Sequence, residues 1–106
     1  MKLAKLLGDS LERIREFPER ARNEAGHQIY RAQIGPEPKD WKPLKTVGSG
    51  VREIRIRDES GAYRVIYLAN VANAIYVLHA FQKKTQATSE RDLALASRRY
   101  AEIARR

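Results

Sequence analysis

The chain contains no cysteine, only one tryptophan and two histidines, and no long run of apolar residues. Without cysteine, neither disulfide bonds nor thiolate chemistry can contribute. No segment approaches the roughly 20 apolar residues that a membrane-spanning helix requires. The apolar part of the N-terminal MKLAKLLGDS is also too short for a signal peptide. These absences predict a cytoplasmic protein with no membrane partner.

Several catalytic signatures are missing as well. His27 and His79 lie far apart in the sequence, with no suitably spaced carboxylates near either one, so a metal site is not expected. The chain has no G-x-S-x-G motif, no glycine-rich phosphate loop and no dinucleotide fingerprint. Acidic residues are scattered mainly through predicted helices, which gives no support to a glycosidase-like carboxylate pair. Most enzyme classes are excluded, and we expect neither a metal nor a cofactor.

Acidic residues are also outnumbered. The 106 residues include 21 lysines and arginines against 13 acidic residues, a formal net charge of +8. This length fits one domain over residues 1–106, and the 42% hydrophobic content predicts a folded core. Such an excess of positive charge is typical of domains that bind a polyanion, with nucleic acid the first candidate. An anionic membrane surface, an acidic protein or a simple gain in solubility are the alternatives.

The N-terminal third is predicted to be helical. Asp9 and Glu12 have the spacing of a capping pair for a helix that ends near Pro18, because proline lacks the N–H that a helix needs. A second helix, at about residues 19–34, places Gln28 on its polar face. The apolar stripe of this second helix comprises Ala21, Ala25, Ile29 and Ala32. Residues 2–7 fit either a strand or a helical turn, and residues 35–43 (GPEPKDWKP) are predicted as a loop.

The central part of the chain has the pattern of strands. Residues 51–57 (VREIRIR) alternate, with Ile54 and Ile56 on one face and Glu53, Arg55 and Arg57 on the other. Residues 62–69 and 74–81 predict two further strands, joined by turns at 58–61 and 70–73 (NVAN), in an antiparallel meander with helices on one face. A final helix is predicted to be capped by the pair Ser89 and Asp92 and to carry the stripe Leu93, Ala96, Tyr100 and Ile103. The fold class is α+β.

The meander brings cations together. The start of its second strand lies near the ends of the first and third strands, so Arg57, Arg64, Lys83 and Lys84 should converge at one edge of the sheet. Like charges repel one another, so folding alone gives no reason to gather them, and a phosphodiester between them would relieve the repulsion. The predicted catalytic residues are Arg64, His79, Lys83 and Lys84. The predicted RNA-binding residues are Arg55, Arg57, Arg52 and Lys45.

These residue types fit cleavage of RNA without a metal. Arginine grips a phosphate through two parallel hydrogen bonds and stabilises the charge that builds on a pentavalent phosphorus. A lysine among other cations has a lowered pKa and becomes available for proton transfer. His79 is the natural first candidate for that role, because its ordinary pKa lies near neutrality.

Each candidate also has a structural interpretation. Arg55 and Arg57 fit the solvated face of a strand, and Arg64 fits a surface ion pair with Asp58 or Glu59. His79 fits a hydrogen-bonded core histidine, and Lys83 and Lys84 fit charges that discourage edge pairing. The aromatic and imidazole side chains interpreted as core, structural or incidental are Tyr63, Tyr67, Tyr76, Trp41 and His27.

The chain resembles the HigB-like toxins of the RelE superfamily, in particular the phage-derived group. The segments that carry the resemblance are LGDSLERIREFP (7–18), GVREIRIRD (50–58), YRVIYLA (63–69), IYVLHAFQKKTQ (75–86) and LALASRRY (93–100). The resemblance implies a small curved antiparallel sheet with two N-terminal helices and a C-terminal helix, and a strand at residues 2–7. By motif, Arg55 takes the place of a strand lysine or arginine, Arg64 that of the arginine after the tyrosine, and Lys83/Lys84 that of a basic pair after the last strand.

The resemblance also implies a function. It points to the toxin of a type II toxin–antitoxin system, a metal-independent endonuclease that cleaves mRNA on the ribosome. The implied partner is an antitoxin, often a helix-turn-helix protein, through which alone the toxin would reach operator DNA. Some relatives place a catalytic tyrosine just before or within the last helix, whereas residues 86–92 here contain none. Two alternatives are a non-catalytic RNA-binding module and a degenerate relative that only binds its antitoxin.

Overall fold

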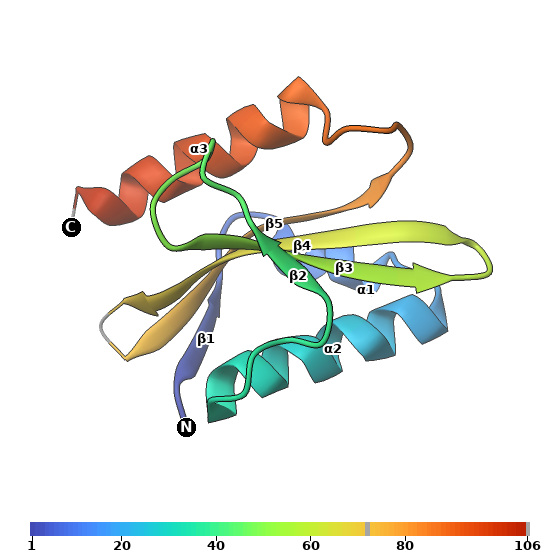
Figure 1. Ribbon diagram of the computed structural model, residues 1–106, viewed down its shortest axis with the longest axis horizontal. Helices are drawn as coiled ribbons and strands as arrows, with labels where there is room; N and C mark the ends of the chain where they lie inside the picture. Colours follow the sequence, from blue (N-terminus) through green and yellow to red (C-terminus); the bar gives the residue numbers. More distant parts are fainter. Residues whose placement is uncertain (72, 106) are drawn as a thin grey trace.

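A five-stranded sheet separates two layers of helix in the computed structural model, which describes residues 1–71 and 73–105 (Figure 1). The strands are β1 (Leu3–Leu6), β2 (Trp41–Pro43), β3 (Val51–Asp58), β4 (Gly61–Val71) and β5 (Ala74–Lys83). The helices are α1 (Ser10–Arg15), α2 (Glu19–Ile34) and α3 (Glu90–Ala104). The spatial order is β1-β5-β4-β3-β2, in which β1 runs parallel to β5 and the other neighbours are antiparallel.

The α+β class and the central meander are confirmed, but the helices cover both faces of the sheet rather than one. Helices α1 and α2 lie on one side and α3 on the other (Figure 1). The reason is visible in β5, where every residue from Ala74 to Phe81 is buried. A strand whose side chains are apolar in both directions needs cover on both faces, and a single helical layer cannot provide it.

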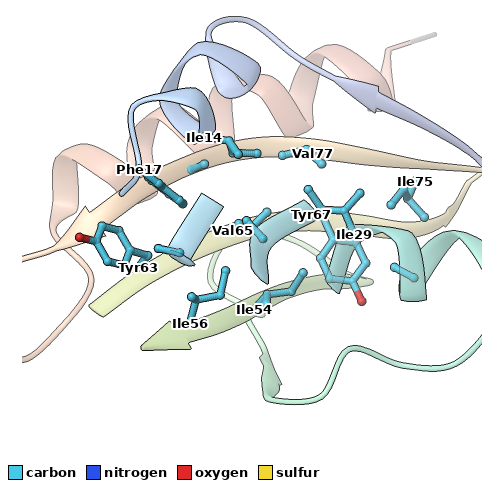
Figure 2. Close-up of a cluster of buried hydrophobic side chains, with 14 residues drawn as sticks. Ile14, Phe17, Ile29, Ile54, Ile56, Tyr63, Val65, Tyr67, Ile75 and Val77 are labelled. Carbon is cyan, nitrogen blue, oxygen red and sulfur yellow. The ribbon is translucent and has the colours of Figure 1, made fainter. Parts of the chain in front are cut away.

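The first core lies between the sheet and the two N-terminal helices (Figure 2). Ile54 and Ile56 of β3 point into it, as the alternation of residues 51–57 predicted. Tyr63 and Tyr67 of β4 are also buried there, and the ring of Phe17 packs 4.8 Å from that of Tyr63. Tyr76 is buried in the second core, under α3. The interpretation of all three strand tyrosines as core residues is confirmed.

Two short strands at the edges of the sheet complete it. Residues 3–6 form β1, as the resemblance implied. Residues 41–43, predicted as loop, form β2 instead, which pairs with β3 through Trp41 opposite Ile54. A three-residue strand rich in proline carries no periodic signal, and here β3 supplies the hydrogen-bonding edge. Of the predicted turn at 70–73, Ala72 lies outside the described residues, and β4 continues to Val71.

Helix ends follow the predicted caps only in part. Ser89 caps α3, its hydroxyl accepting a hydrogen bond from the backbone N–H of Asp92, as expected. Asp9 stands at the N-cap of α1, but its carboxylate makes no capping bond. That carboxylate accepts hydrogen bonds from Arg13 and Arg99 instead, so it ties α1 to α3. An arginine offers a charge-assisted bond that outcompetes a capping N–H.

Gln28 does not lie on the polar face of α2, where the helical pattern placed it. It is buried, accepts a hydrogen bond from the backbone N–H of Lys39 and donates one to Glu24. The loop after α2 therefore folds back onto the helix and covers this position. No helix in residues 1–71 and 73–105 has the length and apolar character needed to cross a membrane.

Candidate functional site

The face of the sheet below α3 is divided into an apolar half and a basic half. Under α3, the strands contribute Val51, Ile66, Leu68, Tyr76 and Leu78, which pack against Ala96 and Ile103 of the helix. Toward the β3–β4 turn, the same face carries charged side chains, and α3 packs mainly on β5. The covered half stabilises the fold, and the open half is the candidate site.

The strand register places the cations of the open half in adjacent rows. Arg55 of β3 pairs with Arg64 of β4, and Arg64 pairs in turn with Phe81 of β5. One row further, Arg57 pairs with Ala62, which pairs with Lys83. Directly paired residues point to the same face of a sheet. The structure therefore brings Arg57, Arg64 and Lys83 together, as the meander predicted, and adds Arg55, which was not part of that prediction.

Lys42 of β2 joins them, and we call Lys42, Arg55, Arg57, Arg64 and Lys83 the basic cluster. Lys42 lies opposite Glu53, and its Nζ is 3.9 Å from Glu53 Oε1. The sequence pattern does not indicate Lys42, because residues 35–43 have the proline and glycine content of a loop. Strand β2 is what orients it toward the cluster.

Glu53 is the acidic centre of the basic cluster and was not predicted as a site residue. Its side chain is fully buried, and Oε1 also lies 3.9 Å from Nε of Arg64. Its other oxygen accepts a hydrogen bond of 2.8 Å from the Thr88 hydroxyl, on the loop that leads into α3. The alternation of β3 placed Glu53 beside Arg55 and Arg57. Its burial depends on the loop, which no local pattern indicates.

Arg64 is held just below the surface of the cluster. Its relative exposure is 4%, and Nη1 donates a hydrogen bond to the backbone carbonyl of Tyr63. Burial lowers the pKa of Arg64, and the attraction of Glu53 opposes that shift. The predicted pairing with Asp58 or Glu59 across the turn does not form; the ion-pair partner is Glu53.

Two guanidinium N–H groups in the cluster have no hydrogen-bond partner in residues 1–71 and 73–105. Nε of Arg55 and Nε of Arg64 are buried and have no hydrogen-bond partner among the described residues. Unpaired buried donors cost free energy, so such groups call for an explanation. For Arg64, the nearby Oε1 of Glu53, 3.9 Å from Nε, offsets part of this cost by charge attraction.

Lys83 is the cluster member with a perturbed amine. Its pKa is lowered, first because partial burial disfavours the charged form and then because Arg64 repels it. A lysine whose pKa falls toward neutrality exchanges protons more readily than an ordinary one. Among the predicted catalytic residues, Lys83 therefore combines access to the cluster with a shifted pKa.

His79 lies outside the cluster, in the interior beside the start of α3. Its Nε2 is 2.7 Å from Oδ1 of Asp92, and its ring stacks 5.2 Å from that of Phe81. The side chain is only 3% exposed. This is the environment of a hydrogen-bonded core histidine, which was the structural interpretation. It indicates that His79 anchors the N-terminus of α3 on β5.

The burial of His79 predicts how stability depends on pH. Desolvation lowers its pKa below the ordinary 6.5, although the hydrogen bond to Asp92 opposes the shift. The unfolded chain therefore binds a proton at a higher pH than the folded protein does. We expect the free energy of unfolding to fall as the pH decreases below about 6.5, through the contribution of His79.

Urea unfolding at a series of pH values between 7.5 and 5 measures this contribution. His79→Asn is expected to reduce the loss of stability over this range, whereas His27→Asn, at an exposed helical position, should leave it unchanged. Equal pH profiles for the wild type and His79→Asn would show that His79 does not titrate as inferred.

Lys84 lines a depression together with Lys83 and His79, beside the start of α3. It is exposed and follows the last residue of β5. It also lines a second depression between α1 and the start of α3, with Arg13, Gln82 and Asp92. The structure therefore brings the predicted residues His79, Lys83 and Lys84 to one depression, and of the three only Lys83 also shares the strand rows of the basic cluster.

Arg52 and Lys45 are also separated from the basic cluster. Arg52 pairs with Pro43 and follows the face of β3 opposite to that of Glu53 and Arg55. Its guanidinium carbon lies 4.1 Å from the centre of the Trp41 ring. Lys45 lines the same depression as Trp41 and Arg52. The alternation of β3 already implied opposite faces for Arg52 and Arg55.

The C-terminal helix supplies no tyrosine to the site. Tyr100 packs on Gly48, where an added Cβ would lie 2.4 Å from a ring atom, and its hydroxyl points to the backbone of Ser49. It belongs to the apolar half of the face. In the described residues, no group of three or more histidine, cysteine or acidic side chains could hold a metal ion.

Comparison with solved structures identifies the fold. The chain is similar to a chain of the intact E. coli RelBE toxin–antitoxin complex, with 13% identity and a TM-score of 0.61 over 80% of this chain and 100% of that one. A mutant of E. coli toxin RelE in the free state matches with 16% identity and a TM-score of 0.59, over 98% and 95% of the two chains. The isolated E. coli RelE toxin matches with 13% identity and a TM-score of 0.57, over 99% and 97%. The architecture is therefore that of the RelE toxins.

A family model narrows the assignment. Residues 12–101 match the family described as phage derived protein Gp49-like (DUF891). No match to a curated protein was found by sequence. The chain belongs to the phage-derived Gp49-like family, in agreement with the predicted phage-derived group, and its fold is that of the RelE toxins.

Proposed function

We propose that this protein is the toxin of a type II toxin–antitoxin pair, and that it cleaves mRNA on the ribosome without a metal ion. The observation that carries the proposal is the basic cluster, five cations on one face of the sheet, of which Lys42 and Arg64 pair with the buried Glu53. The Gp49-like family and the RelE fold support it.

The cluster has the parts that cleavage of a phosphodiester needs. The ribose 2′ oxygen attacks phosphorus, the bond to the 5′ oxygen breaks, and a 2′,3′-cyclic phosphate and a 5′-hydroxyl end are produced. Arg64 and Arg55 would donate hydrogen bonds to the phosphorane oxygens, with Arg57 and Lys42 adding positive charge. Lys83 in its neutral form would accept the 2′-hydroxyl proton, and solvent would supply the proton that the departing 5′ oxygen takes.

The other predicted residues take supporting roles. His79, through Asp92, would position α3 and the loop that holds Thr88, so it acts on the site indirectly. Lys84 would contact a phosphate of the message at the rim of the cluster. Glu53 would hold Arg64 and Lys42 in place by charge. The buried acid thus offsets part of the repulsion among five cations.

The proposed partner is a cognate antitoxin that covers the basic cluster in the resting state. One of the similar structures is a toxin–antitoxin complex. An acidic segment of the antitoxin would neutralise the cluster as the message does, which makes the two ligands mutually exclusive. We further propose a helix-turn-helix antitoxin, through which the complex reaches operator DNA.

Controlled expression tests the function. Induction without the partner is expected to arrest growth within one generation and to create new 5′ ends inside translated messages, both prevented by co-expression of the antitoxin. New ends should vanish when translation initiation is blocked first. Growth arrest with intact messages would contradict cleavage and favour a non-catalytic RNA-binding protein, whereas complex formation without any toxicity would indicate a degenerate relative.

A further inference from the structure

Trp41 has an environment that the fold does not explain. It is the only tryptophan of the chain. It lies on the edge strand β2 and belongs to neither hydrophobic core. Its side chain is partly exposed, and the Arg52 guanidinium stacks over the ring at 4.1 Å. The sequence interpretation of Trp41 was structural or incidental, and the structure leaves part of its side chain exposed beside Arg52.

The stacked pair lines a depression with both apolar and cationic walls. Its volume is about 400 Å³, and its lining includes Trp41, Pro43, Lys45, Val51 and Arg52. This volume lies within the range of small-molecule sites. An aromatic ring, a stacked guanidinium and a lysine at the margin are the parts from which proteins build sites for single-stranded nucleic acid.

The depression is connected to the basic cluster by the edge of the sheet. On β2, Lys42 points to the cluster side, 3.9 Å from Glu53, while its neighbour Trp41 follows the opposite face. No strand in the described residues pairs with the outer edge of β2. A nucleotide strand that leaves the cluster past Lys42 therefore reaches Trp41 by crossing one short strand.

The charges around the depression favour an anion. Lys42 lies within the Trp41–Pro43 segment and Lys45 lies two residues after it, and both side chains are exposed. Among the acids on this side, Glu37 pairs with Arg52 at 3.7 Å and Asp40 directly precedes Trp41 in the chain. The ion pair with Glu37 orients the guanidinium. The plane of the Arg52 guanidinium lies over the indole, so it offers a surface for stacking a base rather than two hydrogen bonds to a phosphate.

We propose that the Trp41–Arg52 pair is a stacking site for a nucleobase next to the cleaved linkage, with Lys45 contacting the adjoining phosphate. The inference rests on the proposed function, because it takes the ligand to be single-stranded RNA. The site grips the message without touching the reacting atoms, and it reads bases by stacking rather than by hydrogen bonds. It therefore tolerates any base at that position.

Binding of a labelled 2′-O-methyl RNA oligonucleotide, followed by fluorescence anisotropy at low salt, tests the site. The blocked 2′ oxygen prevents cleavage while the bases remain. Trp41→Ala is expected to weaken binding about 10-fold, within the range for loss of one stacked base, and Trp41→Phe by less. Tyr30→Ala, which removes an exposed aromatic side chain from α2, should leave the affinity unchanged.

An oligonucleotide of the same length with abasic sugars separates stacking from charge. It should bind the wild type and Trp41→Ala with equal affinity, because only the phosphates remain. In the wild type, the emission of the single tryptophan should change on binding the normal oligonucleotide and stay constant with the abasic one. Equal weakening for both oligonucleotides, or a constant emission with both, would overturn the inference.

The failure of this site and the failure of the function are distinguishable. Normal message cleavage by Trp41→Ala together with wild-type RNA affinity would remove the stacking site and leave the proposed function standing. Absence of RNA binding and of cleavage by the wild type would overturn both. Loss of antitoxin binding alone in Trp41→Ala would assign the depression to the protein partner and overturn the RNA proposal.

Discussion

Replacing Arg64 by alanine is expected to slow message cleavage by about 100- to 1,000-fold, the usual cost of losing one preorganised donor to the transition state. Arg64 lies at the centre of the basic cluster. It pairs with Arg55 on the neighbouring strand and is close enough to Lys83 to repel its charge. It is also the cluster arginine with the least freedom, because it is almost fully buried and bound to the backbone of Tyr63. The measurement is the rate at which new message ends appear in a purified translation system.

Two variants control for charge and folding. Arg22→Ala removes the same charge from an exposed position on α2, which lies on the opposite side of the sheet from α3. This variant should cleave at the wild-type rate. Arg64→Lys keeps a cation beside Glu53 but loses the planar fork, so a rate between those of wild type and Arg64→Ala is expected. Wild-type cleavage by a folded Arg64→Ala protein would exclude Arg64 from the site.

Replacing Glu53 by alanine is expected to lower the free energy of unfolding by about 3 kcal/mol, as when one partner of a buried ion pair is removed. The side chain is fully buried, so its loss leaves Arg64 without its counter-ion. It also removes the acceptor for Thr88 and therefore the tether of the loop before α3. Repulsion among the remaining cations adds to the cost.

Urea unfolding at pH 7 measures the effect of Glu53→Ala. Glu53→Gln should lose less, because the amide oxygen still accepts the hydrogen bond from Thr88 while the charge is gone. Glu16→Ala, at a side chain that is 71% exposed, should change the free energy by less than about 0.5 kcal/mol. A Glu53→Ala protein as stable as the wild type would show that the carboxylate does not hold the cluster together.

The sequence predicts the strands of the meander well and its edges poorly. Alternation in 51–57 and apolar runs in 62–69 and 74–81 are local signals, and β3, β4 and β5 extend these segments by only a few residues. The short β1 and β2 exist because β5 and β3 offer hydrogen-bonding edges, which is a tertiary cause. The second helical layer follows from both faces of β5 being apolar, a signal that was present but not used.

The candidate site was predictable where it depends on register. Arg55, Arg57, Arg64 and Lys83 meet because neighbouring antiparallel strands fix their positions. The burial of Glu53 was not predictable, because it depends on the loop that holds Thr88. For His79 the sequence left both a catalytic and a core interpretation open, and the contact with Asp92 of α3 favours the core one. The positions of Lys42 and Trp41 were not predictable either, because they depend on the pairing of β2 with β3. The sequence pattern thus predicts where the cations lie, whereas the packing of loops and helices determines which of them are accessible to a ligand.

The chemistry of the cut message ends tests the central claim, that cations on the open half of the sheet cleave RNA through its own 2′-hydroxyl. Translated messages from the purified reaction should carry 5′-hydroxyl ends downstream of the cut and cyclic or 3′-phosphate ends upstream. A message with a single 2′-deoxy sugar at the cut site should remain intact. Ends that carry a 5′-phosphate, or cleavage of the 2′-deoxy message at the same site, would contradict the account.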